Sequence, residues 1–110
     1  MRHFLLFYDF APDYLARRAN YRDRHLARAW PASERGELIL AGALADPVDM
    51  GVLLFKAETS STAEDFARSD PYVINGLVTS WRVREWITAV GKDATSSIGK
   101  PQPAEPRKEH

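Results

Sequence analysis

The stretch ELILAGALADPVDMGVLLFKAE, residues 37–58, contains two strand-like segments joined by one turn. Residues 37–45 and 52–58 are rich in aliphatic side chains, whereas residues 46–51 supply the proline, glycine and aspartates typical of a turn. Gly42 interrupts the first segment, which predicts a bulge or a close approach of the backbone. The stretch therefore predicts a hairpin in the middle of the chain, and the elements on either side of it decide the fold.

The segments before the hairpin predict a strand and then a helix. Residues 3–8 form a continuous apolar run, typical of a strand that is buried on both faces. Over residues 14–30 apolar side chains recur at three- and four-residue steps, the spacing of an amphipathic helix. The face expected to be buried carries Leu15, Ala19, Arg22, Leu26, Ala29 and Trp30. Pro31 should end or kink this helix, because its ring removes a backbone donor, and a short piece over residues 32–35 should stop at Gly36.

The segments after the hairpin repeat this pattern. Residues 60–70 predict a second helix, with Phe66 as its main apolar anchor, and Pro71 should end it. An Asn-Gly pair at residues 75–76 turns the chain. Residues 78–90 then alternate as a long final strand does.

The resulting order, strand–helix–strand–strand–helix–strand, predicts an α+β protein with the ferredoxin-like βαββαβ fold and an antiparallel sheet. Helices cover one face of such a sheet. The apolar content of all four strands is too high for the other face to remain exposed to water. We therefore expect a homodimer in which two sheets pack face to face, as in a dimeric α/β barrel.

The composition changes after Gly91. Residues 92–110 are polar, contain three of the seven prolines and have one lone larger aliphatic side chain, Ile98. Such a segment cannot bury enough apolar surface to offset its chain entropy. We expect one domain over residues 1–91 and a disordered tail over residues 92–110.

Composition also excludes several partners. With 15 basic and 15 acidic residues the formal net charge of the 110-residue chain is zero, whereas nucleic-acid binding would need a clustered basic excess. The apolar run at the N-terminus is too short to span a membrane. The absence of cysteine excludes disulfides and a cysteine nucleophile, and a cytoplasmic location is expected. With three histidines, none at ligand spacing, and no glycine-rich phosphate loop, neither a metal nor a cofactor is expected.

Three short motifs occur in an order that resembles a known family. They are Arg-x-x-His on the first helix (Arg22, His25), Gly-x-Leu with a following Gly (Gly36, Leu38, Gly42), and Asp-Pro-Tyr after the second helix (Asp70, Pro71, Tyr72). By this order and spacing, residues 1 to about 90 resemble the YciI-like (YCII-related) proteins of the dimeric α/β-barrel group. Trp30-Pro31 departs from the uninterrupted helix that is usual in that family.

The resemblance implies an active site built around His25 and Asp70. Family members with an assigned activity are similar to lyases that act on ring-substituted aromatic compounds, for example by eliminating chloride from hydroxylated chloroaromatics. The resemblance thus implies a small cofactor-independent enzyme. Its chemistry would be acid–base chemistry of the lyase or isomerase type, on a small anionic metabolite that is aromatic or not.

The chemistry of the two residues agrees with this interpretation. An imidazole changes charge near neutral pH, so His25 can act as a general base or acid, although a lone helix histidine is more often simply half-exposed. Asp70 can accept a hydrogen bond from one ring nitrogen of His25 and leave the other for substrate. An Asp before Pro is also a common N-cap, and a carboxylate has acceptor positions for both roles. Arg17 and Arg18 are expected to be solvated.

The other candidates would bind the substrate. Arg22 lies in the expected buried stripe, where an unpaired guanidinium is costly; it binds a substrate carboxylate or phenolate, or forms a salt bridge with Asp9 or Asp70. Tyr72 can donate its hydroxyl to substrate, but packing is the commoner role of an aromatic after Pro. Tyr8, at the end of the first strand, is expected to line the same pocket.

Two other functions stay open at this point. The same residues could hold a metabolite without chemistry, in a non-catalytic binding or regulatory dimer. A cofactor-free monooxygenase follows only from analogy with other proteins of this fold.

Overall fold

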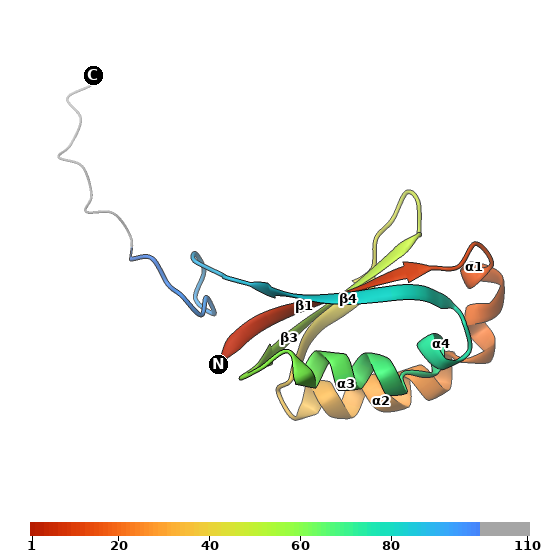
Figure 1. Cartoon of the computed structure of the whole chain (residues 1–110), viewed down its shortest axis with the longest axis horizontal. Helices are drawn as coiled ribbons and strands as arrows, with labels where there is room; N and C mark the ends of the chain where they lie inside the picture. Colours follow the sequence, from red (N-terminus) through yellow and green to blue (C-terminus); the bar gives the residue numbers. More distant parts are fainter. Residues whose placement is uncertain (100–110) are drawn as a thin grey trace, which may run out of the picture.

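The computed structural model describes residues 1–99, which form a four-stranded antiparallel sheet with helices on one face (Figure 1). The elements are β1 (Arg2–Phe10), α1 (Tyr14–Arg17), the 3₁₀ helix η1 (Arg18–Asn20), α2 (Arg22–Glu34), β2 (Leu38–Ala43), β3 (Met50–Ala57), α3 (Ser61–Ser69), α4 (Pro71–Ile74) and β4 (Val78–Trp86). The predicted ferredoxin-like α+β fold is confirmed.

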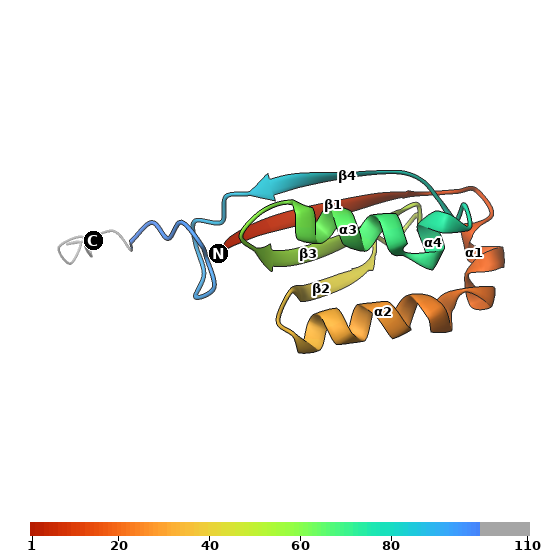
Figure 2. The same cartoon turned by 60° about the horizontal axis from the view of Figure 1, so that its bottom comes forward.

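The strand order is β2-β3-β1-β4, so β3 and β1 are the central strands and β2 and β4 are the edges. Leu6 in β1 lies opposite Leu53 in β3 and Val83 in β4, and this register places their side chains on the helix-covered face. Figure 2 shows α3 lying across the central strands and α2 running along the edge strand β2. The space between α2 and β2 becomes important below.

The core lies between the sheet and the helices. Its buried side chains include Phe4, Leu6, Leu53, Phe55, Phe66 and Leu77. Alanines occupy the helix positions closest to the sheet, and Ala63 and Ala67 of α3 are fully buried. Small side chains there allow close packing of helix on sheet.

The first helical region is interrupted at a different position from the predicted one. The helix predicted over residues 14–30 is interrupted at η1, and α2 continues through Pro31 to Glu34. Pro31 is exposed and lies in the last turns of α2, and its carbonyl accepts a hydrogen bond from the Arg35 N–H. Gly36 ends the segment with φ +82°, as predicted.

The predicted buried stripe of this helix is confirmed at Ala29 and wrong at its larger side chains. Leu15, Leu26 and Trp30 are 55%, 38% and 62% exposed, whereas the buried residues of α2 are Ala29 and Ala32. Arg22, Leu26, Ala29 and Trp30 do share one face of α2, but that face borders the space between α2 and β2, so its larger side chains stay exposed.

Gly42 does not have the role predicted for it. The irregularity in the pairing of β2 with β3 lies between Leu38 and Leu40, and a Cβ placed at Gly42 would meet no heavy atom within 4 Å. Gly42 lies in an edge strand with open space beside it. The close approach occurs instead at Gly51 in β3.

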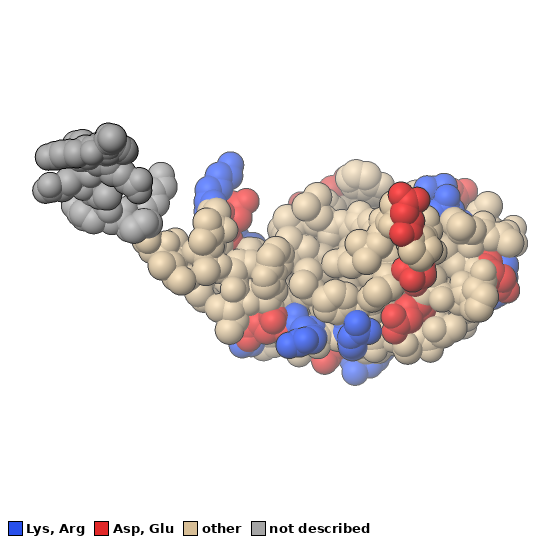
Figure 3. All heavy atoms as spheres, turned by 90° about the horizontal axis from the view of Figure 1, so that it is seen from above, with Lys and Arg blue, Asp and Glu red and all other residues tan. Residues whose placement is uncertain are grey.

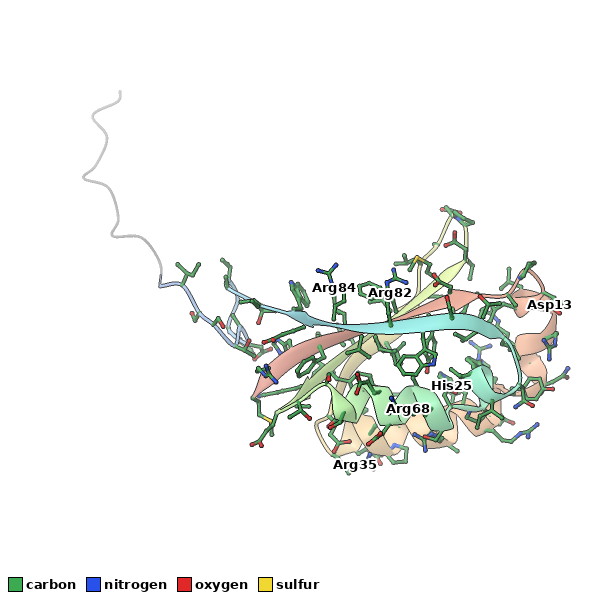
Figure 4. The ribbon with its side chains drawn as sticks, viewed as in Figure 1. Asp13, His25, Arg35, Arg68, Arg82 and Arg84 are labelled. Carbon is green, nitrogen blue, oxygen red and sulfur yellow. The ribbon has the colours of Figure 1, made fainter. Side chains whose placement is uncertain are left out.

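The face of the sheet opposite the helices is open. Leu40 and Trp86 are 71% and 47% exposed, and Arg82 and Arg84 point away from the helices, while Arg35 and Arg68 lie on the helical side (Figure 4). Viewed from above, this face is mostly uncharged, with scattered charged side chains (Figure 3).

The end of the described chain folds back on itself. β4 ends at Trp86, and the N–H groups of Ser96 and Ile98 donate to the carbonyls of Thr88 and Ala89. The remainder of the predicted tail, residues 100–110, lies outside the described residues, and the disordered tail stays a prediction. None of the helices in residues 1–99 has the length and apolar character needed to cross a membrane.

Candidate active site

Asp70 is completely buried at the junction of α3 and α4. Its Oδ1 accepts from the Tyr72 backbone N–H at 3.0 Å, and its Oδ2 accepts from the Tyr8 hydroxyl at 2.7 Å. The predicted N-cap with Pro71 in the first turn is therefore confirmed. A buried carboxylate is costly unless donors surround it, and these donors come from different elements.

His25 supplies a further donor from α2. Its Nδ1 lies 2.8 Å from Oδ1 and 3.0 Å from Oδ2 of Asp70. When Asp70 is ionised it can only accept, and a neutral His25 then donates through Nδ1–H and keeps Nε2 as its acceptor nitrogen. The side chain of His25 is 15% exposed and borders the pocket described below. The structure thus brings together the two residues that sequence analysis chose as catalytic candidates.

A series of aromatic rings holds the imidazole in place. The ring of Tyr72 stacks on His25, with centroids 4.0 Å apart and planes within 6°. Tyr14 meets Tyr72 edge-on at 5.8 Å, and Phe10 stacks on Tyr14 at 3.7 Å. Stacking restricts rotation of the His25 ring, and the contact to Asp70 then fixes its orientation.

Gly51 makes room for this series, and sequence analysis missed it. A Cβ at Gly51 would lie 2.9 Å from Cζ and 3.3 Å from Cε1 of Phe10, closer than side chains pack. A glycine at the end of a predicted turn gave no sign of this role, because the close approach involves a strand far away in sequence.

The pocket has a volume of about 400 Å³ and lies between α2 and the edge strand β2. Its size is within the range of small-molecule sites. Its aromatic and polar wall consists of Tyr8, Phe10, Tyr14, His25 and Tyr72, and its outer wall includes Leu26, Trp30, Ile39, Leu40 and Gly42.

Two arginines border the pocket. Arg22 is exposed and forms no salt bridge within residues 1–99, so neither predicted pairing, with Asp9 or with Asp70, is present. Asp9 instead pairs with Arg82 at 3.4 Å. Arg18 also lines the pocket, although it was expected to be solvated, and its guanidinium lies 5.8 Å from the Tyr14 ring centroid. Arg18 and Arg22 are four residues apart in the sequence, and this spacing could have indicated that both side chains border the pocket.

Tyr8 lines the pocket, but its hydroxyl is already bonded to Asp70 and the residue is 2% exposed. Burial and the negative charge of Asp70 raise the pKa of the Tyr8 phenol far above its usual range, against a smaller opposing effect of Arg28. Burial, with a smaller contribution from Tyr14, raises the pKa of Tyr72 to about 12, and Arg22 opposes that rise. Both phenols therefore stay protonated at neutral pH, and Tyr8 positions the carboxylate.

Nothing in residues 1–99 gathers three or more His, Asp or Glu side chains in an arrangement that could hold a metal ion. The polar groups at the pocket are thus an imidazole, a carboxylate behind it, two guanidinium groups and phenols.

The family of the chain follows from its sequence as a whole. The model of the YCII-related domain matches residues 1–87. The chain belongs to the YCII-related domain family. The resemblance noted from the motifs is therefore confirmed over most of the chain. No curated protein matches this YCII-related chain.

Among solved structures, the YCII-related chain is similar to 5-chloro-2-hydroxyhydroquinone dehydrochlorinase from Burkholderia phenoliruptrix AC1100, in complex with 2,5-dihydroxybenzoquinone. The TM-score is 0.67 and the identity is 21%, over 79% of this chain and 95% of that chain. At this identity the likeness shows the shared fold.

Proposed function

We propose that this YCII-related protein is a small enzyme that needs no cofactor and performs lyase- or isomerase-type acid–base chemistry on a small anionic metabolite. The observation that carries the proposal is the hydrogen bond of 2.8 Å between His25 and the buried Asp70 at the wall of a pocket. The similar fold of an enzyme named for dehydrochlorination of a hydroquinone supports ring compounds as the first substrates to test.

His25 is the group that moves the proton in this proposal. Asp70 holds the Nδ1–H, so Nε2 takes a proton from an O–H or C–H group of the substrate. The electron pair of that bond moves into the substrate, where it expels a leaving group or shifts a double bond. The imidazolium that forms is stabilised by the Asp70 carboxylate and later returns the proton.

Arg22 and Arg18 hold the anionic group of the substrate. Both border the pocket and lack a carboxylate partner at salt-bridge distance within residues 1–99, and Arg18 also lies over the phenol ring of Tyr14. Guanidinium groups bind carboxylates and phenolates through paired N–H donors. The ring of an aromatic substrate would pack against the wall formed by Phe10, Tyr14 and Tyr72.

We also propose that the protein works as a homodimer that buries the open face of the sheet. Leu40, Trp86 and the aliphatic stems of Arg82 and Arg84 would lie in the interface. Light scattering should give twice the chain mass of 12.4 kDa at micromolar concentration. A mass of one chain would contradict this arrangement.

The decisive experiment compares wild type with His25→Asn on a panel of chlorinated and unchlorinated hydroquinones, followed by ring absorbance and chloride release. The Asn amide nitrogen can replace Nδ1 as donor to Asp70, but nothing replaces Nε2. Turnover should fall roughly 10²- to 10⁴-fold while the folded structure persists. Arg24→Ala, an exposed change on the same helix, is the matched control.

Turnover near the wild-type level in His25→Asn would contradict the role of His25. Saturable binding of panel compounds without turnover by wild type would favour the non-catalytic metabolite-binding alternative.

A further inference from the structure

A second cavity, of about 370 Å³, lies between α2 and α3 and shares no lining residue with the first pocket. Arg28 of α2 and Arg35, the C-cap of α2, border it on one side, and Thr62, Asp65, Phe66 and Ser69 border it from α3. The proposed reaction uses none of these side chains.

Arg28 is the unusual residue of this cavity. Its Nε atom is buried and has no hydrogen-bond partner within residues 1–99, and its guanidinium carbon lies 5.1 Å from the centroid of the Phe66 ring. Buried donors in proteins are almost always bonded, because an unpaired one loses its hydration without replacement. The Nε atom itself is closed to solvent, whereas the terminal N–H groups of Arg28 are accessible, and they are the donors that a ligand acceptor in the cavity would meet.

The charges around the cavity indicate the sign of that ligand. Arg35 is paired with Glu37 at 3.0 Å, and Asp65 is paired with Arg68 at 3.3 Å. Arg28 forms no salt bridge within the described residues, so its positive charge is the one that lacks a partner at contact distance. This balance favours an occupant with a negative charge.

We propose that this cavity binds a small oxyanion, a phosphate or a carboxylate, through the guanidinium of Arg28. A planar guanidinium presents its donors in the geometry that these oxygen groups accept. The cavity is large enough for either group.

The position of this site couples it to the candidate active site. His25 and Arg28 are one turn apart on α2, and α3 runs directly into Asp70. Phe66 of α3 lies beside both His25 and Arg28. Its ring meets the His25 ring edge-on, with centroids 6.4 Å apart, and it also lies under the Arg28 guanidinium. An anion between the helices holds together the two elements that carry the His25–Asp70 pair.

The test is a titration of the full chain with sodium phosphate, and separately with sodium acetate, at constant pH and ionic strength set with chloride. NMR follows the Arg28 Nε–H signal, the α2 and α3 amides and the His25 ring. Wild type should show saturable shifts centred on Arg28, with smaller shifts at the His25 ring. The salt that saturates at lower concentration identifies the preferred oxyanion class.

Three variants decide where the anion binds. Arg28→Met should weaken binding at least tenfold, whereas Arg24→Met, which removes the same charge from the exposed side of α2, should leave it unchanged. Arg28→Lys, which keeps the charge, should weaken it less than Arg28→Met and serves if the Met variant does not fold. Arg22→Met, a change in the first pocket, should leave the saturable shifts centred on Arg28 unchanged.

Any one of three results would overturn the proposal. The first is the absence of saturable shifts with both salts, and the second is equal affinity in wild type and Arg28→Met. The third is loss of binding in Arg22→Met, which would place the anion in the first pocket.

Discussion

The two walls of the first pocket are built in opposite ways. On the inner wall, Tyr8, Asp70 and Tyr72 are at most 5% exposed, and Asp70 binds donors from β1, α2 and α4. On the outer wall, Trp30 and Ile39 are 62% and 41% exposed and belong to the side of α2 and to the edge strand β2.

The difference separates chemistry from recognition. Proton transfer requires groups fixed within fractions of an ångström, which buried hydrogen bonds and stacked rings provide. Recognition of a substrate tolerates a loosely packed apolar surface. Changes to the inner wall should therefore reduce stability and chemistry together, and changes to the outer wall should alter ligand affinity alone.

Asp70→Ala should give the largest effect. It leaves the Tyr8 hydroxyl, the Tyr72 N–H and the His25 Nδ1–H without their acceptor in a buried place. We expect a loss of about 3–5 kcal/mol in the free energy of unfolding, measured by urea denaturation. Asp65→Ala, an exposed acid on the adjoining helix, should stay within about 0.5 kcal/mol of wild type. A loss below about 1 kcal/mol for Asp70→Ala would show that the inner wall is not held by this carboxylate.

The inner wall also shows how far the sequence allowed prediction. The order of the elements followed from local periodicity and turn residues, whereas the pair of His25 and Asp70 was implied by the resemblance to the YCII-related family. The Tyr8 hydroxyl bond to Asp70 could not be predicted, because it joins residues 62 positions apart without a local signature.

The outer wall was harder to predict for a different reason. Leu26 and Trp30 have the spacing of a buried stripe, yet they face a pocket, and Arg22 lies among them because the stripe borders open space. Periodicity shows that side chains share a face, but it does not show whether that face meets a core or a cavity.

Gly51→Ala should have the next largest effect. The new methyl group would push against the Phe10 ring, and the displacement would pass through Tyr14 and Tyr72 to His25. We expect a loss of about 1–3 kcal/mol in unfolding free energy and a change in near-ultraviolet circular dichroism. Gly42→Ala has open space for its methyl group and is the control. Equal stability of the two variants would mean that Phe10 moves aside without cost.

The inner wall should also weaken at alkaline pH. The pKa of Tyr72 is raised from 10.0 to about 12, so above pH 10 the unfolded chain releases the phenol proton while the folded chain keeps it. This contribution to stability is complete below pH 10 and is lost as pH rises through about 12. At pH 11 the contribution of Tyr72 to this loss is about 1 kcal/mol, and Tyr8, whose pKa is also raised, adds its own. The contribution of Tyr72 is measured as the difference between wild type and Tyr72→Phe in how far the free energy of urea unfolding falls from pH 9 to pH 11. Tyr72→Phe should show a smaller fall over this range, and an equal fall would assign the effect to other groups.

Trp30→Ala should have the smallest effect on stability, within about 0.5 kcal/mol, because the indole is largely exposed. It should nevertheless weaken the binding of an aromatic ligand roughly 5- to 10-fold, which corresponds to the loss of about one aromatic contact, as measured by calorimetry. Trp86→Ala removes an equally large ring that does not line the pocket, and ligand affinity should not change. If Trp30→Ala instead lost as much stability as Gly51→Ala without loss of affinity, the outer wall would be part of the core. The division between a fixed chemical wall and an adaptable recognition wall would then be wrong, even with His25 and Asp70 in contact.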